Sequence, residues 1–404
     1  MFEFSKKNLK GTFLNLPMEA VHYGSGSLSN LSKSLESYGI KRALLVTSNS
    51  LMNKTKLVEK VIEASEGKVA TTFHECRQHV PRSAVIKGAE MARSNDVDGI
   101  ITFGGGSAND TAKGICIALS ENIEDVDSFD KVRIKFEYPD KLEIPSLNGK
   151  TLPHIAISTT LSAGEFTYFS GITDEKRKVK DLYLDPQICA KQVILDPDLS
   201  LETPLWLWLS TGMRSVDHCI EAMVSSTAHP FTDGLAVRAL NILTQYLRET
   251  KSNPDDLIAR TQCQIAGWMS VYGLANVTLG LSHGIGHQLG ARCDVPHGIT
   301  SCVMMPTVMN FNKDFTDGRL ALVAETMGKD VRNFNNDQAA DAAIDAVLQL
   351  TKDLDQPYRL RDVGVEENDF KGIAKDALED LIVASNPRPV KTEQEVIDLL
   401  KEAY

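Results

Sequence analysis

Four histidines in the second half of the chain have the spacing that metal binding or proton transfer requires. His283 and His287 are four residues apart and therefore share one face of a predicted helix, and His297 follows ten residues later. His218 lies earlier on a predicted apolar helix, where a buried histidine that is merely hydrogen-bonded is the commoner case. Imidazoles bind divalent metals and also exchange protons near neutral pH. The spacing alone leaves both chemistries open.

A glycine-rich turn in the first half of the chain could hold a phosphate group. An apolar run over residues 97–103 leads into Gly104, Gly105, Gly106 and Ser107 and then into a segment with helical character. Glycine lets backbone N–H groups approach an anion, and a helix start adds partial positive charge there. The spacing differs from G-x-G-x-x-G, but a steric turn needs fewer glycines. The turn therefore predicts a phosphate-binding loop.

Short strands and helices alternate around this turn. We expect strands at residues 20–23, 42–47, 69–73, 97–103 and 154–160, and helices at residues 28–38, 52–66 and 84–94. This order predicts an α/β fold with a parallel, Rossmann-like sheet covered by helices. Ligands of such sheets bind at the carboxyl ends of the strands, where the glycine turn falls. A second polar turn, at residues 161–165, ends a neighbouring strand and could face the same ligand.

The character of the chain changes near residue 200, where strand signals nearly vanish. Helical periodicity is seen at residues 205–226, 234–249, 255–274, 319–327, 336–354 and 367–384. A chain of 404 residues also exceeds the size at which one core usually stops growing. We therefore predict an α/β domain over residues 1–199 and an all-α domain over residues 200–404.

The composition indicates which kind of binding partner and which compartment to expect. The net charge of −11 argues against nucleic acid or an anionic membrane surface, so a small-molecule ligand is expected. The seven cysteines are scattered without a C-x-x-C pair, which is typical of reduced thiols. Because neither a signal peptide nor a membrane-spanning run is evident, we expect a cytoplasmic protein.

Taken together, these motifs resemble the iron-containing alcohol dehydrogenase superfamily over about residues 21–310. The shared motifs are, in order, Gly104–Ser107 with Asp110 and Lys113, Thr159–Thr160, Asp196–Leu199, Thr211–Gly212 with His218 and Glu221, His283 with His287, and His297–Gly298. The resemblance implies an enzyme that moves hydride between NAD or NADP and an alcohol, aldehyde or ketone. It also implies a two-domain plan shared with dehydroquinate synthase, with a dinucleotide-binding α/β domain over residues 1–199 and a helical catalytic domain over residues 200–404. We expect a homodimer.

The resemblance implies a cofactor site on the first domain. The predicted cofactor-binding residues are Ser48, Gly104, Gly105, Gly106, Ser107, Asp110, Thr159, Thr160, Ser162 and Lys180, with the pyrophosphate on the glycine turn. The acidic residue with which the family selects its cofactor is replaced by the segment Ser48–Ser50. Without a carboxylate to hold a ribose hydroxyl or repel a 2′-phosphate, both NAD and NADP stay open.

The metal site of the family is altered in this chain. The family binds iron or zinc with one Asp and three His, and the histidine positions match His218, His283 and His297. Four residues before His218, where the Asp is expected, stands Arg214, and a guanidinium repels a cation and coordinates nothing. Asp217 is adjacent to His218, so on a helix it points about 100° away from it. The sequence therefore favours a site without metal; a bound metal would be held by the three histidines.

The residues predicted to serve catalysis are Arg214, His218, His283, His287 and His297. The resemblance places His287 near the nicotinamide, and we expect it to relay the proton. Arg214 could stabilise the developing alkoxide or bind a substrate carboxylate. It could equally form only a salt bridge to Asp217 or Glu221.

Three alternatives follow from the same residues. Maleylacetate reductases resemble this superfamily and work without metal, and residues 78–81 are similar to their His-x-Pro segment. Their Tyr-Ala-Gly-Ser-Glu turn differs from Leu-Ser-Ala-Gly-Glu at residues 161–165. A lyase similar to dehydroquinate synthase would use NAD without net turnover, and a non-catalytic nucleotide-binding protein is the third possibility.

Overall fold

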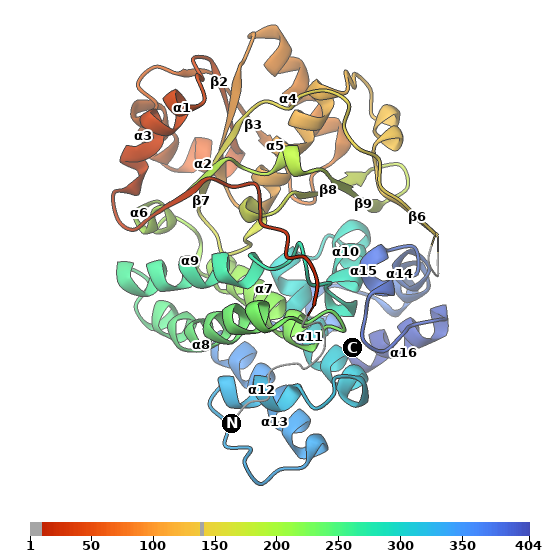
Figure 1. The fold of residues 1–404 in the computed structure, drawn as a ribbon. Coiled ribbons are helices and arrows are strands. Elements are labelled where there is room, and N and C mark those ends of the chain that lie inside the picture. The colour runs from red at the N-terminus through yellow and green to blue at the C-terminus, as the bar shows by residue number, and fades with distance from the viewer. Residues whose placement is uncertain (1–9, 138–140) are drawn as a thin grey trace. The chain divides into compact units, whose positions relative to one another are not determined.

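A computed structural model describes residues 10–137 and 141–404, and the chain divides into two compact units (Figure 1). The sheet unit comprises residues 16–135 and 142–204. The helical unit comprises residues 205–404 together with residues 10–15 and the described part of residues 136–141. The division after residue 204 separates the strand-rich part of the sequence from the helical part. The functions predicted for residues 1–199 and 200–404 stay predictions.

The sheet unit is built on six parallel strands in the order β1-β10-β7-β4-β2-β3. These strands are β1 (Ala20–Tyr23), β2 (Ala43–Ser48), β3 (Val69–Cys76), β4 (Gly99–Gly104), β7 (His154–Ser158) and β10 (Gln192–Leu195). The predicted parallel α/β fold is thereby confirmed. Two further two-stranded sheets pair β5 (Lys135–Glu137) with β6 (Lys141–Glu143) and β8 (Phe169–Asp174) with β9 (Val179–Leu184).

Alternation along the central strands fills a core on each face of the sheet. Leu44 of β2 and Ile100 of β4 belong to one buried cluster, whereas the next residues, Leu45 and Ile101, belong to another. Because successive side chains point to opposite faces, an apolar run in a parallel strand must be covered on both sides. The helices that follow the strands supply this cover.

The helices of the sheet unit are α1 (Leu31–Ser37), α2 (Asn49–Lys54), α3 (Leu57–Ala64), α4 (Arg82–Ser94), α5 (Gly106–Ser120) and α6 (Pro197–Ser200). The single helix predicted over residues 52–66 is wrong, because two helices occupy that stretch. Thr55 ends α2 in an extended conformation, and its hydroxyl accepts a hydrogen bond from the N–H of Leu57 at 3.2 Å. A β-branched residue with a hydroxyl competes in this way with the helical backbone.

The helical unit contains α7 (Leu205–Val224), α8 (Pro230–Ser252), α9 (Leu257–Val271), α10 (Leu281–Cys293), α11 (His297–Asn312), α12 (Leu320–Thr326), α13 (Asn336–Asp353), α14 (Phe370–Ala377), α15 (Leu381–Ala384) and α16 (Glu393–Glu402). The all-α prediction for this part of the chain is confirmed. A buried apolar cluster joins α10 and α11 to α14 and α16. Among the described residues, no helix is long and apolar enough to cross a membrane.

Candidate active site

The glycine turn and the predicted second turn lie against each other at the carboxyl edge of the sheet. Strands β4 and β7 are neighbours, and the N–H of Thr159 donates to the carbonyl oxygen of Gly104 at 3.0 Å. Gly104 has φ +149°, which favours glycine. A Cβ on Gly105 would lie 2.8 Å from Oγ1 of Thr160, so the two turns pack closely only because residue 105 has no side chain.

The start of α5 in this turn is open to an anion. Gly105 is the N-cap residue, and no side chain caps the helix. The first intrahelical bonds run from the N–H groups of Ala108 and Asn109 to the carbonyl of Gly105, so the N–H groups of Gly106 and Ser107 precede them. Such uncapped N–H groups, at the positive end of a helix dipole, are the elements of a phosphate site.

The other predicted cofactor residues are distributed around this edge. Ser48 ends β2, which neighbours β4, and its hydroxyl caps α2 by accepting from the N–H of Leu51 at 3.2 Å. Oδ2 of Asp110 accepts from the N–H of Gly171 in β8 at 3.3 Å. The side chain of Lys180 lies over Gly171, since a Cβ there would be 2.1 Å from its Cε. Asp110 and Lys180 therefore approach the same point of the β8–β9 hairpin.

Lys113, the lysine that follows the glycine turn, has a structural role. Lys113 is fully buried in α5, and its ammonium donates to the carbonyl of Gly164 at 2.6 Å, Oγ1 of Thr167 at 3.1 Å and the carbonyl of Phe169 at 2.8 Å. Burial lowers the pKa of Lys113. Its contacts tie the loop that follows β7 to the helix that follows β4.

In the helical unit, α7, α10 and α11 carry the five predicted catalytic residues and bring them together. The rings of His218 and His283 are stacked with centroids 4.8 Å apart, and those of His287 and His297 are stacked at 5.5 Å. Arg214 contacts the second pair, since its Nη2 lies 2.7 Å from Nε2 of His297. Four of these side chains are buried, and His297 is partly buried.

Arg214 is held by several partners. It is 2% exposed, and its Nη1 donates to Oγ of Ser301 at 2.9 Å and lies 3.4 Å from Oδ2 of Asp217. A guanidinium can only donate, so Nε2 of His297 must accept the hydrogen bond from Nη2. Burial lowers the pKa of Arg214 to about 10, which still leaves a cation at neutral pH. The expected salt bridge to Asp217 is present, together with contacts that a salt bridge alone does not require.

Asp217 points into the cluster. Its Oδ2 accepts from the hydroxyls of Ser282 at 2.8 Å and Ser301 at 2.6 Å, and lies 3.5 Å from Nδ1 of His283. Helix geometry predicts that Asp217 points about 100° away from His218. In the structure that side of α7 still faces the cluster, because both α10 and α11 contact it there. Burial raises the pKa of Asp217.

Glu221 orients His283 and caps α10. One carboxylate oxygen accepts from Nδ1 of His283 at 2.7 Å and from the N–H of Gly280 at 2.8 Å, and the other accepts from the N–H of Ser282 at 2.8 Å. Nδ1 of His283 therefore carries the proton, and among the described residues its buried Nε2 has no hydrogen-bond partner. Burial lowers the pKa of both His218 and His283 well below the ordinary value, so both rings are neutral.

The partner of His287 was not predicted from the sequence. Oδ2 of Asp380 lies 2.9 Å from Nδ1 of His287, although 93 residues separate them. The other oxygen of Asp380 accepts from the N–H of Ile382 at 2.8 Å and so caps α15. An Asp before a short helix signals a cap, but nothing in the sequence signals its second contact.

The cluster does not fit a divalent cation on the three predicted histidines. Within residues 10–137 and 141–404, ligand atoms of His218, His283 and His297 do not converge to within 4.8 Å of one another, whereas those of Asp217, Glu221 and His283 do. Three of the four carboxylate oxygens in the latter group already accept from serine hydroxyls, backbone N–H groups and an imidazole. Among the described residues, Oδ1 of Asp217 is buried without a hydrogen-bond partner. The lone pair of His297 at Nε2 is taken by Arg214.

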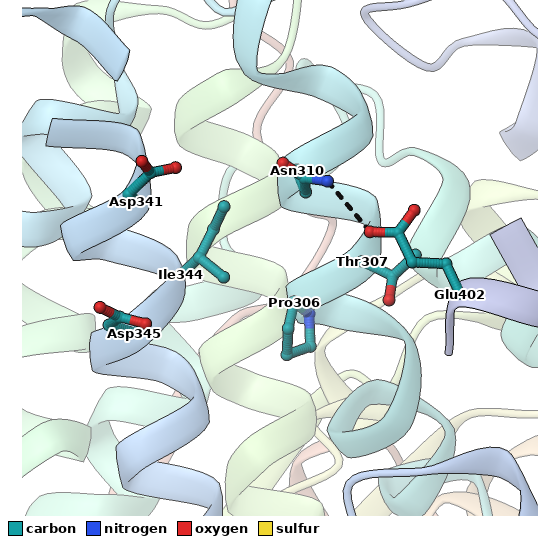
Figure 2. A pocket seen from close by; sticks show the side chains of 7 residues that line it. All are labelled: Pro306, Thr307, Asn310, Asp341, Ile344, Asp345 and Glu402. Carbon is teal, nitrogen blue, oxygen red and sulfur yellow. Dashed lines mark hydrogen bonds between the residues drawn. The ribbon is translucent and has the colours of Figure 1, made fainter. Parts of the chain in front are cut away.

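A hollow of about 300 Å³ lies elsewhere in the helical unit, between α11, α13 and α16 (Figure 2). The carboxylates of Asp341, Asp345 and Glu402 line it, and Glu402 accepts from Nδ2 of Asn310 at 3.0 Å. None of the predicted catalytic residues lines this hollow. It is therefore separate from the histidine cluster.

Known proteins of one family match this chain over nearly its whole length. A family model described as iron-containing alcohol dehydrogenase matches residues 18–197, and one described as the C-terminal part of the Fe-containing alcohol dehydrogenase family matches residues 208–404. The chain is 33% identical over 385 residues to the NAD-dependent methanol dehydrogenase of Bacillus methanolicus, covering 94% of this chain and 97% of that protein.

Two further proteins are similar to this chain over nearly its whole length. The NADPH-dependent butanol dehydrogenase of Clostridium saccharobutylicum is 32% identical over 380 residues, which cover 93% of this chain and 94% of that protein. The crystal structure of a 1,3-propanediol oxidoreductase superposes with a TM-score of 0.86 at 29% identity, covering 98% of this chain and 100% of that one.

Proposed function

This chain belongs to the iron-containing alcohol dehydrogenase family, and we propose that it transfers hydride between C4 of NAD(H) or NADP(H) and the carbon of an alcohol, aldehyde or ketone. It is an oxidoreductase, in which the nicotinamide carries the redox chemistry and the protein supplies orientation and charge. One relative is named NAD-dependent and another NADPH-dependent, so a nicotinamide cofactor is what the relatives share.

The observation that carries this proposal is the uncapped start of α5 packed against the turn after β7. The N–H groups of Gly106 and Ser107 would bind the pyrophosphate, with Gly105 lying close to Thr160. The cofactor site would be completed by Ser48, Gly104, Asp110, Thr159, Ser162 and Lys180.

Proton transfer falls to His287. In the reductive direction, hydride forms the new C–H bond, the π electrons of the carbonyl move to oxygen, and the alkoxide takes a proton. Because Asp380 accepts from Nδ1 of His287, Nε2 is left to bind and release that proton, and the carboxylate stabilises the imidazolium. Asp380 is thus proposed as a positioning residue.

The test is a substrate screen with NADH and NADPH, with and without Fe²⁺ or Zn²⁺. It covers primary alcohols, their aldehydes, ketones and one carboxylate-bearing substrate, maleylacetate. We expect a change in absorbance at 340 nm that is proportional to substrate consumed. Substrate consumption without any change at 340 nm would instead indicate a lyase, and absence of nucleotide binding would contradict the proposal outright.

We further propose a cytoplasmic homodimer. All seven cysteines are unpaired, as is common in a reducing compartment. Light scattering coupled to size-exclusion chromatography measures the mass directly, and a single monomer mass of 44.4 kDa would contradict the dimer.

A further inference from the structure

We propose that the guanidinium of Arg214 takes the place of the divalent cation in this active site, so that the enzyme works without a bound metal. This inference rests on the proposed function and specifies how its carbonyl is polarised. Positive charge that is fixed before the reaction can stabilise an oxyanion as it develops.

The first support is the contact between Arg214 and His297. The 2.7 Å hydrogen bond from Nη2 uses the lone pair of Nε2 with which this imidazole would bind a metal. Arg214 is buried and tied to Ser301 and Asp217 as well, so it occupies a fixed position inside the cluster. A cation bound beside it would lack one ligand and would also lie next to the positive charge of the guanidinium.

The second support is formal charge. A divalent cation with one Asp ligand contributes +2 and −1, a sum of +1. An arginine at the Asp position without the cation contributes +1 as well. Replacing Asp by Arg therefore offsets the loss of the cation, and the remaining carboxylates of the cluster are balanced to the same degree in both arrangements.

The third support is that one of the three predicted ligands, His283, keeps the surroundings of a metal-bound histidine. Glu221 fixes the proton of His283 on Nδ1, so the buried Nε2 presents a lone pair without a partner among the described residues. A carboxylate behind an imidazole is the usual outer partner of a metal-bound histidine. Arg214 occupies Nε2 of His297, so replacing it should free that ligand and allow the three histidines to close around a metal.

Arg214 also keeps donors for a substrate oxygen. Of its five N–H groups, three point to Ser301, Asp217 and His297. Nε is buried with no hydrogen-bond partner among the described residues, and one N–H remains on Nη2. Either could donate a charge-assisted hydrogen bond to an alkoxide.

The test measures metal binding rather than turnover. Wild type, Arg214→Asp and the charge-matched control Arg214→Lys are stripped with chelator, dialysed against Zn²⁺ or Co²⁺, and analysed for metal content and by titration calorimetry. We expect no stoichiometric metal in wild type or Arg214→Lys. We expect about one equivalent in Arg214→Asp, with Zn²⁺ affinity at least about 100-fold above wild type. Adding His283→Ala to that variant should abolish the gain.

Wild type that retains one equivalent of iron or zinc, and loses it on His283→Ala, would overturn the inference. So would absence of any gain in a folded Arg214→Asp variant. If that variant does not fold, Arg214→Gln removes the cation without adding a buried carboxylate and should still bind Zn²⁺ more tightly than wild type; no gain there also overturns the inference. NADH binding, measured on the same samples, tests the proposed function separately, because the predicted nucleotide residues lie in the sheet unit.

Discussion

Replacing Gly105 by alanine tests the nucleotide turn most directly. The backbone of Gly105, at φ −97° and ψ −160°, is open to any residue, so no backbone strain is introduced. The added Cβ would instead lie 2.8 Å from Oγ1 and 2.9 Å from Cγ2 of Thr160. Overpacking of this kind costs about 1–3 kcal/mol. If the displaced turn is the one that binds pyrophosphate, the Kd for NADH should rise between roughly 5-fold and 150-fold.

The assay is a fluorescence titration of NADH, with thermal unfolding measured in parallel. Gly234→Ala is the matched control, because Gly234 lies in α8 with open space around its ideal Cβ. That substitution should leave the Kd unchanged and stabilise the protein by up to about 1 kcal/mol. Combining Gly105→Ala with Thr160→Ala removes the two closest contacts and should recover part of the lost affinity. Equal Kd values for Gly105→Ala and the control would refute the assignment of the turn.

Three other substitutions each test the role of one buried side chain. Lys113→Met should destabilise the protein by about 3 kcal/mol in urea unfolding, because three buried acceptors lose their donor; an unchanged midpoint would contradict this role. Burial raises the pKa of Glu165 from 4.5 to about 7, so folding stability is lost as the pH rises between these values and stays lower above them. Glu165→Gln should therefore stabilise the protein at pH 8, by at most about 3 kcal/mol, and much less at pH 5; equal effects at both pH values would be inconsistent with this cause. Asp380→Asn lets the amide donate to Nδ1 of His287, which moves the proton to Nε2, and alcohol oxidation should slow by roughly 10²–10⁴-fold in kcat with little change in NADH affinity. A similar loss of NADH affinity would point to a structural role.

Sequence patterns within single elements were sufficient to predict the main strands and the helix that carries two of the histidines. The apolar runs at residues 42–47, 97–103 and 154–160 predict strands of a parallel sheet, and the corresponding strands β2, β4 and β7 lie side by side in the structure. The i, i+4 spacing of His283 and His287 likewise predicts the helix that carries both. In each case the periodicity of one element determines where its own side chains point.

Contacts between distant segments could not be predicted in this way. The hydrogen bond between His287 and Asp380 spans 93 residues, and the one between Arg214 and Ser301 spans 87. The sequence does not predict the β8–β9 hairpin, because charged residues such as Lys180 and Asp181 interrupt the apolar alternation of β9. Such features depend on packing between elements, which a pattern within one element does not report.

The orientation of Asp217 shows how contacts between distant segments affect the chemistry of the site. Helical geometry places it away from His218, but α10 and α11 surround α7, so Asp217 reaches Ser282 and Ser301 and becomes the counterion of Arg214. In Arg214→Asp this counterion is left beside a second buried carboxylate, and two like charges in a buried cluster raise each other's pKa. The variant should therefore be less stable than wild type without metal and should recover stability as Zn²⁺ is added, because a ligand that binds only the folded state stabilises it. A rise in Tm with Zn²⁺ in Arg214→Asp, but not in wild type, would link the charge at position 214 to the metal requirement by an equilibrium measurement. A similar rise in wild type would show that Arg214 does not keep the metal out.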